Sequence, residues 1–340
     1  MIIIRADANG QIGAGHIMRC LSIAQELRKR GEEPVFVTAD HNSDPYISRN
    51  HFRSVCLDSA WDDMESELPA LISCLRTLEA DLMIIDSYQV TDRYFNSLSE
   101  TVKTVYIDDM NKDHWDVDAL IDYNIFAAGL DYSWYEKKGK PLLLGLSYVP
   151  LRAEFQDIPS RGMGNTVKDI LISAGGADPQ NISEKIMREI CPKDEWKETC
   201  FRFVIGALNP RIEELKAIAS EYPNIILHIN EKKMSQLMMR CDLAVSAAGS
   251  TLYELCACGV PTITYTLADN QKIAADYFGD QGLMINAGDC RGNDSFIANI
   301  DRCLKTLSSD KDLRERMSKK MQSLVDGRGA GRIADYCLKL

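Results

Sequence analysis

The sequence predicts an α/β fold in which two Rossmann-type, doubly wound parallel-sheet domains face a cleft. Its 340 residues exceed the size at which a single hydrophobic core usually stops growing. Short β-branched runs alternate with helical patterns along both halves, which is typical of parallel sheets wrapped by helices. The segment Pro150 to Thr166 carries prolines, glycines and mixed charge without a clear period. We therefore place a linker there and expect domains at residues 1–155 and 156–340.

The first domain opens with a βαβ unit. Its first helix is indicated by Met18, Leu21 and Leu27 at helical spacing, and Gly31 stands where a left-handed cap would end it. The strands expected in this domain are Ile2 to Arg5, Pro34 to Thr38, Ser54 to Leu57, Leu82 to Asp86, Thr104 to Asp108, Ala119 to Asp122 and Leu142 to Leu144.

The second domain repeats this alternation. Helical patterns from Asp294 to about Val325 and from Ala330 to Leu340 end the chain, and the last helix could pack back on the first domain. Ligands of doubly wound sheets bind beyond the carboxyl ends of the strands, so functional motifs are expected in loops after strands. The strands expected here are Asp169 to Ser173, Phe201 to Ile205, Ile225 to His228, Leu243 to Ser246, Thr262 to Tyr265 and Leu283 to Ile285.

Charge and composition argue against several classes of protein. The formal net charge of -11 disfavours a nucleic-acid partner, because binding to a phosphate backbone draws on clustered Lys and Arg. The run Met1 to Arg5 lacks the cationic region and the apolar length of a signal peptide. No apolar run reaches the roughly 18 residues of a membrane-spanning helix. We expect a cytoplasmic protein without nucleic-acid binding or membrane insertion, monomeric or weakly dimeric.

The eleven cysteines predict neither a metal site nor a redox site, because none forms a Cys-x-x-Cys pair. Cys256 and Cys258 are separated by one residue, and on a helix their thiols would point to different faces. An odd number of cysteines also fits a reducing compartment.

A glycine-rich loop leaves the first strand and opens the first helix. Gly13 and Gly15 let backbone amides approach an anion at the helix N-terminus. The dinucleotide fingerprint Gly-x-Gly-x-x-Gly would place Met18 at its third glycine, so a nicotinamide or flavin site is disfavoured. His16 follows in the first turn, where the helix dipole favours the neutral imidazole. It is either a catalytic base or a residue that bonds its own loop.

Two further motifs follow strands of the second domain. Gly175 and Gly176 precede a helix that Asn181 would cap, and they form either a tight turn or a phosphate or sugar contact. The run from Gly249 to Thr251 offers amides and hydroxyls for a diphosphate at another helix start. Thr251 and Glu254 also match a capping box, whereas Glu254 could instead accept hydrogen bonds from a ribose diol.

Polar residues follow three other strands. Asp269 or Asn270 could cap the helix that begins near Lys272, or Asn270 and Gln271 could read sugar hydroxyls or acetamido groups. In the first domain, Asp86-Ser87-Tyr88 and Asp108-Asp109 end strands, where carboxylates often do no more than cap a helix. Tyr88 would either face the cleft with its polar tip and contact substrate, which we favour slightly, or pack in the core.

Together these motifs resemble the hydrolases of the pseudaminic acid pathway, which remove UDP from UDP-2,4-diacetamido-2,4,6-trideoxy-β-L-altropyranose, and the related spore-coat polysaccharide proteins. The resemblance covers most of the chain, and the order and spacing of its segments are specific. Those segments are Arg5-Ala6-Asp7, Ile12-Gly13-Ala14-Gly15-His16, Asp86-Ser87-Tyr88, Asp108-Asp109, Gly145-Leu146-Ser147-Tyr148, Arg152-Ala153-Glu154-Phe155, Gly175-Gly176-Ala177-Asp178 and Asn270-Gln271.

The resemblance implies a GT-B-like fold, similar to the lipid II synthase that adds N-acetylglucosamine, and activity without a metal or organic cofactor. It implies that His16 is catalytic and that Tyr88 and Asn270 lie in the active site. Ser250, Thr251 and Glu254 match the nucleotide-binding segment of the transferase relatives, and Gly249 is grouped with them. The other candidate substrate-binding residues are Asp7, Gly13, Gly15, Asp108, Gly175, Gly176 and Gln271.

The expected chemistry is hydrolysis of a nucleotide sugar. A nucleoside diphosphate is a weakly basic leaving group, so no strong general acid is needed on its side. We expect His16 to orient or deprotonate a water that attacks the anomeric carbon opposite the diphosphate, with inversion. The alternatives are a glycosyltransferase that passes the sugar to an acceptor hydroxyl and a homologue that binds without turnover. The base, uracil or cytosine, and the identity of the sugar stay open.

Overall fold

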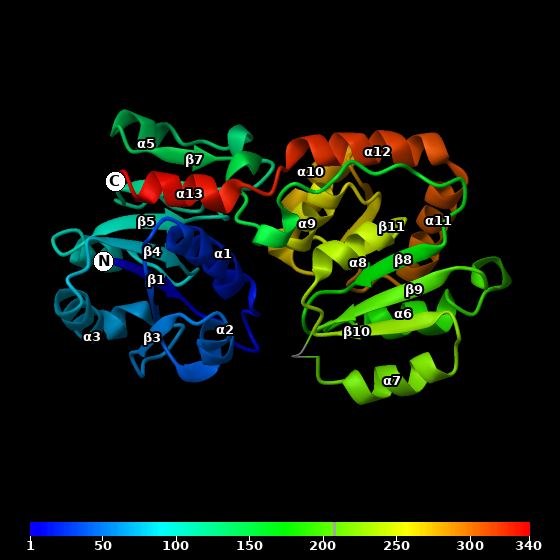
Figure 1. Cartoon of the computed structure of the whole chain (residues 1–340), viewed down its shortest axis with the longest axis horizontal. Helices are drawn as coiled ribbons and strands as arrows, with labels where there is room; N and C mark the ends of the chain where they lie inside the picture. Colours follow the sequence, from blue (N-terminus) through cyan, green and yellow to red (C-terminus); the bar gives the residue numbers. More distant parts are fainter. Residues whose placement is uncertain (207–208) are drawn as a thin grey trace. The chain divides into compact units, whose positions relative to one another are not determined.

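The computed structural model of the chain describes residues 1–206 and 209–340. The chain divides into two compact units, here called unit 1 (Met1–Ala153 with Arg328–Leu340) and unit 2 (Glu154–Gly327) (Figure 1). From the sequence we expected the first domain to end at residue 155 and the second to run to residue 340, with a last helix that could pack back on the first domain. In the structure the chain leaves unit 1 at Ala153 and returns to it at Arg328.

Unit 1 is built on a seven-stranded parallel sheet with the order β3-β2-β1-β4-β5-β6-β7. Its strands are β1 (Ile2–Ala6), β2 (Val35–Thr38), β3 (Arg53–Cys56), β4 (Leu82–Asp86), β5 (Lys103–Ile107), β6 (Ala119–Asp122) and β7 (Leu142–Leu144). Its helices are α1 (Gly15–Lys29), α2 (Asp44–Arg49), α3 (Met64–Thr77), α4 (Asp92–Leu98), α5 (Ser133–Lys137) and α13 (Gly329–Cys337).

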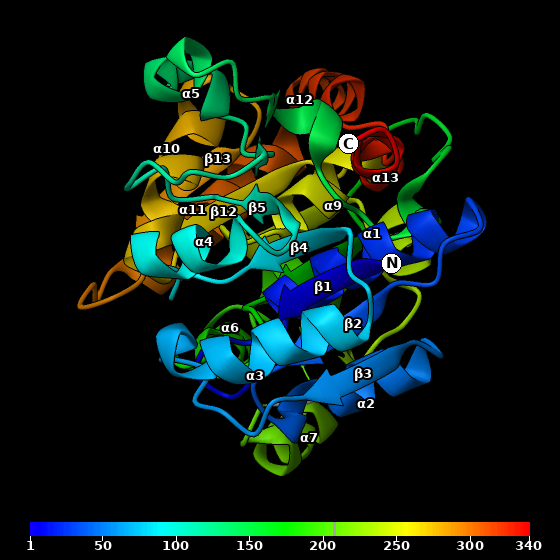
Figure 2. The same ribbon diagram turned by 90° about the vertical axis from the view of Figure 1, so that its left-hand side faces the viewer.

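Helices cover both faces of this sheet, which explains why β1, β2 and β4 are buried along their whole length. Helix α3 packs beside α4, and α1 packs beside α13 (Figures 1 and 2). On the α3 and α4 side, Ile3, Met83 and Ile85 join Leu71 and Phe95 in one core cluster. Alternate residues of each strand therefore point to opposite faces and bury against different helices.

Helix α13 joins unit 1 because small residues let it approach α1 and the loop at Val149 closely. A Cβ atom at Gly329 would lie 2.2 Å from the carbonyl oxygen of Val149, and one at Gly331 would lie 3.2 Å from the Arg30 guanidinium. An ion pair of 2.5 Å between Arg30 Nε and Asp335 Oδ1 adds to the contact.

Over its described residues, unit 2 has a six-stranded parallel sheet with the order β10-β9-β8-β11-β12-β13. Its strands are β8 (Asp169–Ser173), β9 (Cys200–Ile205), β10 (Ile225–Ile229), β11 (Leu243–Ala247), β12 (Thr262–Thr266) and β13 (Ile285–Asp289). Its helices are α6 (Ile182–Glu189), α7 (Ile212–Ser220), α8 (Met234–Arg240), α9 (Thr251–Cys258), α10 (Lys272–Asp280), α11 (Phe296–Ser309) and α12 (Lys311–Leu324).

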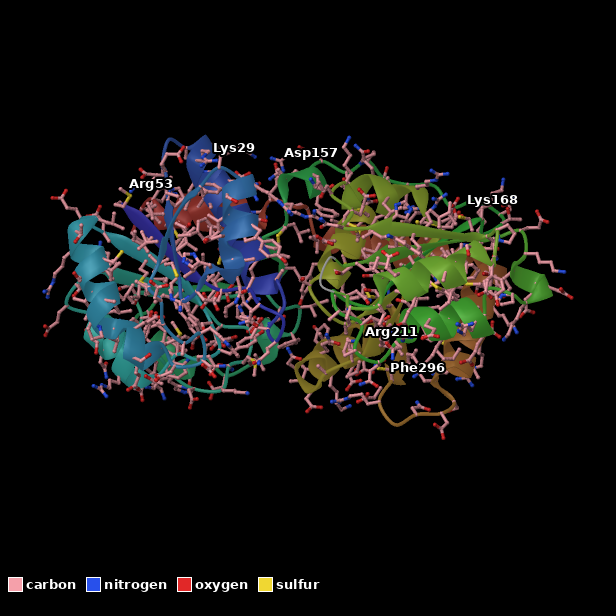
Figure 3. All side chains as sticks on the ribbon, turned by 90° about the horizontal axis from the view of Figure 1, so that it is seen from below. Lys29, Arg53, Asp157, Lys168, Arg211 and Phe296 are labelled. Carbon is pink, nitrogen blue, oxygen red and sulfur yellow. The ribbon has the colours of Figure 1, made fainter. Side chains whose placement is uncertain are left out.

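Each strand predicted from the sequence overlaps a strand of the structure, and β13 differs most. The sequence analysis placed it at Leu283 to Ile285, whereas it begins at Ile285. The backbone amides of Leu283 and Met284 both donate to the carbonyl of Phe278, so these two residues belong to the turn that follows α10. Charged side chains such as those of Lys29, Arg53 and Lys168 lie exposed on the units (Figure 3).

Candidate functional site

The strand order of unit 1 reverses between β1 and β4, which are neighbours with Ala6 opposite Asp86. The chain leaves β1 toward β2 on one side, whereas β4 is followed by β5 on the other. A crevice forms at the carboxyl edge of a doubly wound sheet at such a point. Helix α1 begins there and brings His16 in its first turn, while Asp86 is the last residue of β4.

Asp86 holds His16 and Arg19 together. His16 Nδ1 lies 2.6 Å from Asp86 Oδ1, and Arg19 donates from Nε and from one terminal nitrogen to the two carboxylate oxygens, each at 2.5 Å. The Asp86 side chain is fully buried. Burial by itself would raise the pKa of Asp86, but the opposing effects of Arg19 and His16 are larger and hold this pKa well below its ordinary range. Asp86 is therefore ionised.

An ionised Asp86 determines which nitrogen of His16 carries a proton. The carboxylate can only accept, so Nδ1 carries the hydrogen and Nε2 keeps its lone pair. Within the described residues, no hydrogen-bond partner is found for Nε2. The ring of Tyr88 stands edge-on to the imidazole, with 4.6 Å between the ring centroids. The arrangement is that of a histidine base oriented by a carboxylate.

A small hollow opens beside the imidazole, with about 10 Å³ of space for the centre of a water molecule, which is room for about one water. Besides His16 and Tyr88, its walls include Asp7, whose two oxygens already accept from Arg5 NH1 at 2.5 Å and from the amide of Ala39 at 2.8 Å. Asp7 therefore holds the loop at Ala39 in place and also lines the hollow. The remaining lining residues are Ile12, Trp61, Asp86, Ser87 and Gln89.

Of the two neighbouring carboxylates after β5, Asp109 is the one that reaches the His16 cluster. Tyr88 donates from its hydroxyl to Asp109 Oδ2 at 3.1 Å, and Arg19 donates to the same oxygen at 2.7 Å. Asp108 instead accepts from the amides of Met110 and Asn111 and shapes the turn. Burial raises the pKa of Asp108. The sequence analysis had chosen Asp108 as the substrate contact.

Arg19 and Tyr123 also belong to this cluster, and the sequence analysis did not single them out. Arg19 follows His16 by three residues in α1, a spacing that puts two side chains on one helix face, so the signal was available. The Tyr123 hydroxyl is hydrogen-bonded to Arg19, but nothing in the sequence near β6 marks this tyrosine.

In the loop between β1 and α1, the backbone amides of Gln11 and Ile12 donate to Asn9 Oδ1. Gly13 has φ of 73° and closes a turn with Asn9 through two backbone hydrogen bonds. Helix α1 starts at Gly15, and no side chain caps it. Cβ atoms built at Gly13 and Gly15 would meet nothing within 4 Å, so the space over the loop is open.

Unit 2 has its own strand reversal, between β8 and β11, and two of the predicted motifs follow these strands. Gly175, with φ of 80°, and Gly176 are exposed after β8. Asn181 is the N-cap residue of α6, as expected, but its side chain makes no cap hydrogen bond. The side chain of Asp178 supplies the hydrogen bonds at this helix start, accepting from the amides of Ile182 and Ser183.

The capping-box interpretation of the second motif was wrong. Ser250 is the N-cap residue of α9 and Thr251 is its first residue, and the side chain of Ser250 forms no cap hydrogen bond. Ser250 is exposed, while Gly249, Thr251 and Glu254 are half-buried in and after the loop that follows β11. The hydroxyls and amides at this helix start are thus not used by a side-chain cap.

The third segment forms the short helix η6 (Asp269–Gln271) after β12. Neither Asp269 nor Asn270 caps α10, because its N-cap is Gln271 and Asp269 pairs with Arg291 at 2.6 Å. Gln271 accepts from the amide of Leu267 at 2.9 Å, and Asn270 is exposed.

In the part of the chain that the structure describes, no cluster of metal-ligating side chains surrounds His16; one does form at His41, Cys56 and Asp58. Among the described helices, none has the length and apolar character needed to cross a bilayer.

Comparisons with known proteins confirm the sequence resemblance. A family model described as "Protein of unknown function (DUF354)" matches residues 179–326. The chain is 24% identical to the spore coat polysaccharide biosynthesis protein SpsG of Bacillus subtilis, over 97% of this chain and 95% of that protein. It is 25% identical to the UDP-2,4-diacetamido-2,4,6-trideoxy-beta-L-altropyranose hydrolase of Campylobacter jejuni, over 84% of this chain and 98% of that protein.

An uncharacterized protein of Methanocaldococcus jannaschii, MJ1062, is 26% identical over 81% of this chain, and the match spans only 57% of that protein's length. Among solved structures, MurG of Acinetobacter baumannii superposes with a TM-score of 0.70 at 13% identity, covering 100% of this chain and 99% of MurG. The UDP-GlcNAc 2-epimerase of Neisseria meningitidis bound to UDP-GlcNAc gives 0.66 at 14% identity, covering 100% of both chains. The predicted GT-B-like fold is thereby confirmed.

Proposed function

We propose that this protein is a hydrolase that cleaves a nucleotide-activated deoxy-diacetamido sugar into free sugar and nucleoside diphosphate. The observation that carries the proposal is the Asp86–His16 pair, which leaves His16 Nε2 with a free lone pair beside an open hollow at the strand reversal. The relative named as a UDP-sugar hydrolase, matched over nearly its full length, supports the substrate class.

In the proposed reaction His16 Nε2 takes a proton from a water as its oxygen attacks the anomeric carbon. The bond from that carbon to the diphosphate oxygen breaks on the opposite side, and the diphosphate leaves with the electron pair, so the configuration inverts. Asp86 holds the imidazole in position and stabilises the imidazolium that forms. Arg19 in turn keeps Asp86 ionised and in place through its two hydrogen bonds.

The leaving group requires donors rather than an acid. We assign the nucleotide to the start of α9, where Ser250 and Thr251 offer amides and hydroxyls and Glu254 suits a ribose diol. Gly249 donates its own amide to the carbonyl of Ala247, and its contribution is the absence of a side chain beside the phosphates. Gly175 and Gly176 would supply further amides after β8. Asn270 and Gln271 would contact the acetamido groups of the sugar, and no step needs a metal or an organic cofactor.

We favour UDP over CDP as the nucleotide, because the Campylobacter jejuni relative is named for a UDP-sugar and the Neisseria meningitidis structure holds UDP-GlcNAc. We place the reaction in the cytoplasm, in the biosynthesis of pseudaminic acid or a related surface polysaccharide. The spore coat relative supports this wider assignment.

The decisive experiment incubates the full chain with UDP-2,4-diacetamido-2,4,6-trideoxy-β-L-altropyranose and no acceptor, while proton NMR follows the released sugar and its first-formed anomer. Rapid release of the inverted anomer is expected. His16→Ala should lower turnover by about 10²- to 10⁴-fold while substrate binding survives. His51→Asn is the control, since His51 is exposed at the opposite edge of the sheet and its left-handed φ of 58° suits asparagine.

Three results would contradict the proposal or a part of it. Release that waits on an acceptor hydroxyl would make the protein a glycosyltransferase, the activity named for several structural neighbours of the same fold. Tight calorimetric binding with no product after long incubation would make it a binding protein. Full turnover in His16→Ala would remove this histidine from the reaction.

A further inference from the structure

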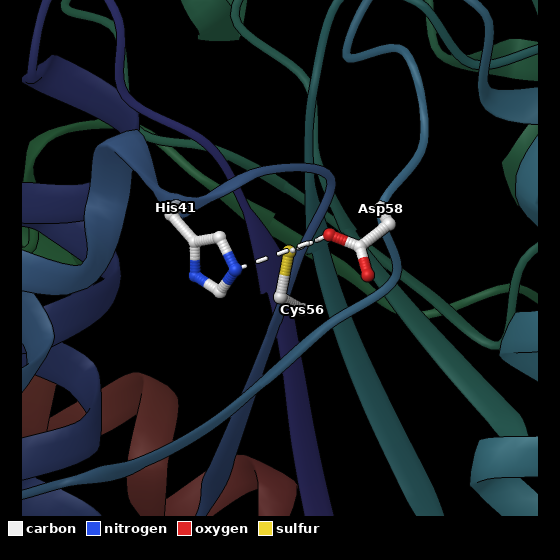
Figure 4. A group of neighbouring side chains, drawn as sticks. All are labelled: His41, Cys56 and Asp58. Atoms are coloured by element: carbon white, nitrogen blue, oxygen red, sulfur yellow. Dashed lines mark hydrogen bonds and ion pairs between the residues drawn. The ribbon is translucent and has the colours of Figure 1, made fainter.

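Three side chains with metal-ligating atoms meet at the carboxyl edge of the sheet in unit 1, outside the His16 cluster. His41 begins the short helix η1 (His41–Ser43) after β2, Cys56 is the last residue of β3, and Asp58 follows two residues later. Strands β2 and β3 are parallel neighbours, with Thr38 paired to Cys56, so both loops leave the same edge. Figure 4 shows the imidazole and the carboxylate pointing toward the thiol between them.

We propose that His41, Cys56 and Asp58 bind one zinc ion, at a site separate from the His16 reaction. Their ligand atoms all lie within 4.8 Å of one another. Cys56 Sγ is 3.4 Å from Asp58 Oδ1, and His41 Nε2 is 3.9 Å from the same oxygen. Ligand atoms around a tetrahedral zinc ion are separated by roughly 3.4 to 3.6 Å, given bonds of about 2.0 to 2.3 Å. The observed spacings need only small side-chain rotations.

The imidazole of His41 is already oriented as a ligand. Its Nδ1 lies 2.7 Å from Asp44 Oδ2, so a hydrogen on Nδ1 leaves Nε2 as the acceptor that faces Cys56 and Asp58. Histidines that bind metals in proteins usually donate their other ring hydrogen to a carboxylate in this way. The side chain of His41 is 71% exposed, so its movement toward an ion disturbs no packing.

The loops that carry the ligands are anchored. Ser43 Oγ accepts from the amide of Ala8 at 2.8 Å, and the amide of Ala39 donates to Asp7 Oδ1 at 2.8 Å. The thiol of Cys56 also lies 3.5 Å from the carbonyl oxygen of Ala39. Anchored loops reduce the entropy lost on binding, because the ligands are held near each other beforehand.

The ligand set selects the ion. A thiolate, an imidazole and a carboxylate are the three donor types of zinc sites, whereas calcium and magnesium take oxygen ligands. Three protein ligands leave the fourth tetrahedral position to water. A thiol binds zinc as the thiolate, so zinc binding releases a proton and should weaken as pH falls.

The test uses the full chain, freed of metal and kept reduced by a reductant that contains no thiol. It is titrated with Co²⁺ as a spectroscopic substitute for zinc. One Co²⁺ per chain should produce a thiolate charge-transfer band in the near ultraviolet, and one equivalent of Zn²⁺ should abolish it. Cys56→Ser should remove the band, and His41→Gln and Asp58→Asn should weaken binding at least tenfold. Asp44→Asn should weaken it by about 10- to 100-fold.

Cys74→Ser is the matched control, because Cys74 is another half-buried cysteine of unit 1, on α3. It should leave the titration unchanged, and circular dichroism should show each variant folded. The proposal is overturned if no charge-transfer band appears, or if the band survives Cys56→Ser. Either result would leave the cluster as a surface ion pair beside a thiol. The cobalt titration does not depend on whether the protein hydrolyses a nucleotide sugar, so the two proposals can fail separately.

Discussion

Asp86→Asn is the substitution that separates orientation of His16 from simple packing, since the amide has the shape of the carboxylate it replaces. In the native protein Oδ1 of Asp86 receives His16 Nδ1 and one Arg19 nitrogen, and Oδ2 receives Arg19 Nε. An asparagine can offer an oxygen to only one of these two positions. An amide nitrogen facing His16 would donate to Nδ1 and move the ring hydrogen to Nε2, which removes the base.

The size of the effect follows from these contacts. If His16 contributes as a general base, the wrong tautomer should lower kcat by about 10²- to 10⁴-fold, with KM changed little. The same substitution removes the ionised partner of a guanidinium that is only 10% exposed. Breaking a buried ion pair costs about 3 to 5 kcal/mol. Because Arg19 would still be paired with Asp109, we expect the free energy of unfolding to fall by about 3 kcal/mol, the lower end of this range.

The assay measures UDP release by wild type, Asp86→Asn, His16→Ala and the double variant, well below the melting temperature of the weakest. Residues that act as one unit are not additive, so Asp86→Asn should cost little more once His16 is absent. If Asp86→Asn lowers kcat by the same factor in both backgrounds, the carboxylate acts through the fold and the reasoning fails.

Three further predictions concern stability and the glycine loops. Burial raises the pKa of Asp122 from 3.8 to about 6, so the free energy of unfolding should fall by up to about 3 kcal/mol as pH rises from 4 to 7. Urea unfolding at several pH values should show a weaker pH dependence of this free energy in Asp122→Asn. A Cβ atom at Gly206 would lie 2.3 Å from the carbonyl oxygen of Gly176, so Gly206→Ala should weaken UDP binding in calorimetry. Gly329→Ala would press on Val149 and should lower stability by about 1 to 3 kcal/mol, seen as a lower melting temperature. An unchanged pH slope in Asp122→Asn, an unchanged UDP affinity in Gly206→Ala or an unchanged melting temperature in Gly329→Ala would contradict the reasoning for that residue.

The strands and the loops that follow them were predictable because their signals are local. Runs such as Leu82 to Asp86 are apolar and β-branched along their length, as a strand buried on both faces must be. Glycines after β1 and β8 were correctly predicted to lie in loops, because glycine adopts the positive φ of Gly13 and Gly175 at the lowest cost. The helix caps were predicted less well, since several polar residues near each helix start compete for the same amides.

The sequence by itself determined the alternation of strands and helices, the motif order and His16 at the start of α1, because periodicity and glycine placement act over a few residues. Only the tertiary structure decided that Asp109 rather than Asp108 joins Arg19, since neighbouring residues at a strand end point to opposite sides. It also decided the return of α13 to unit 1 and the meeting of His41 with Cys56. These contacts join residues far apart in the chain, and the pairing of β2 with β3 and the packing of α13 on α1 create them.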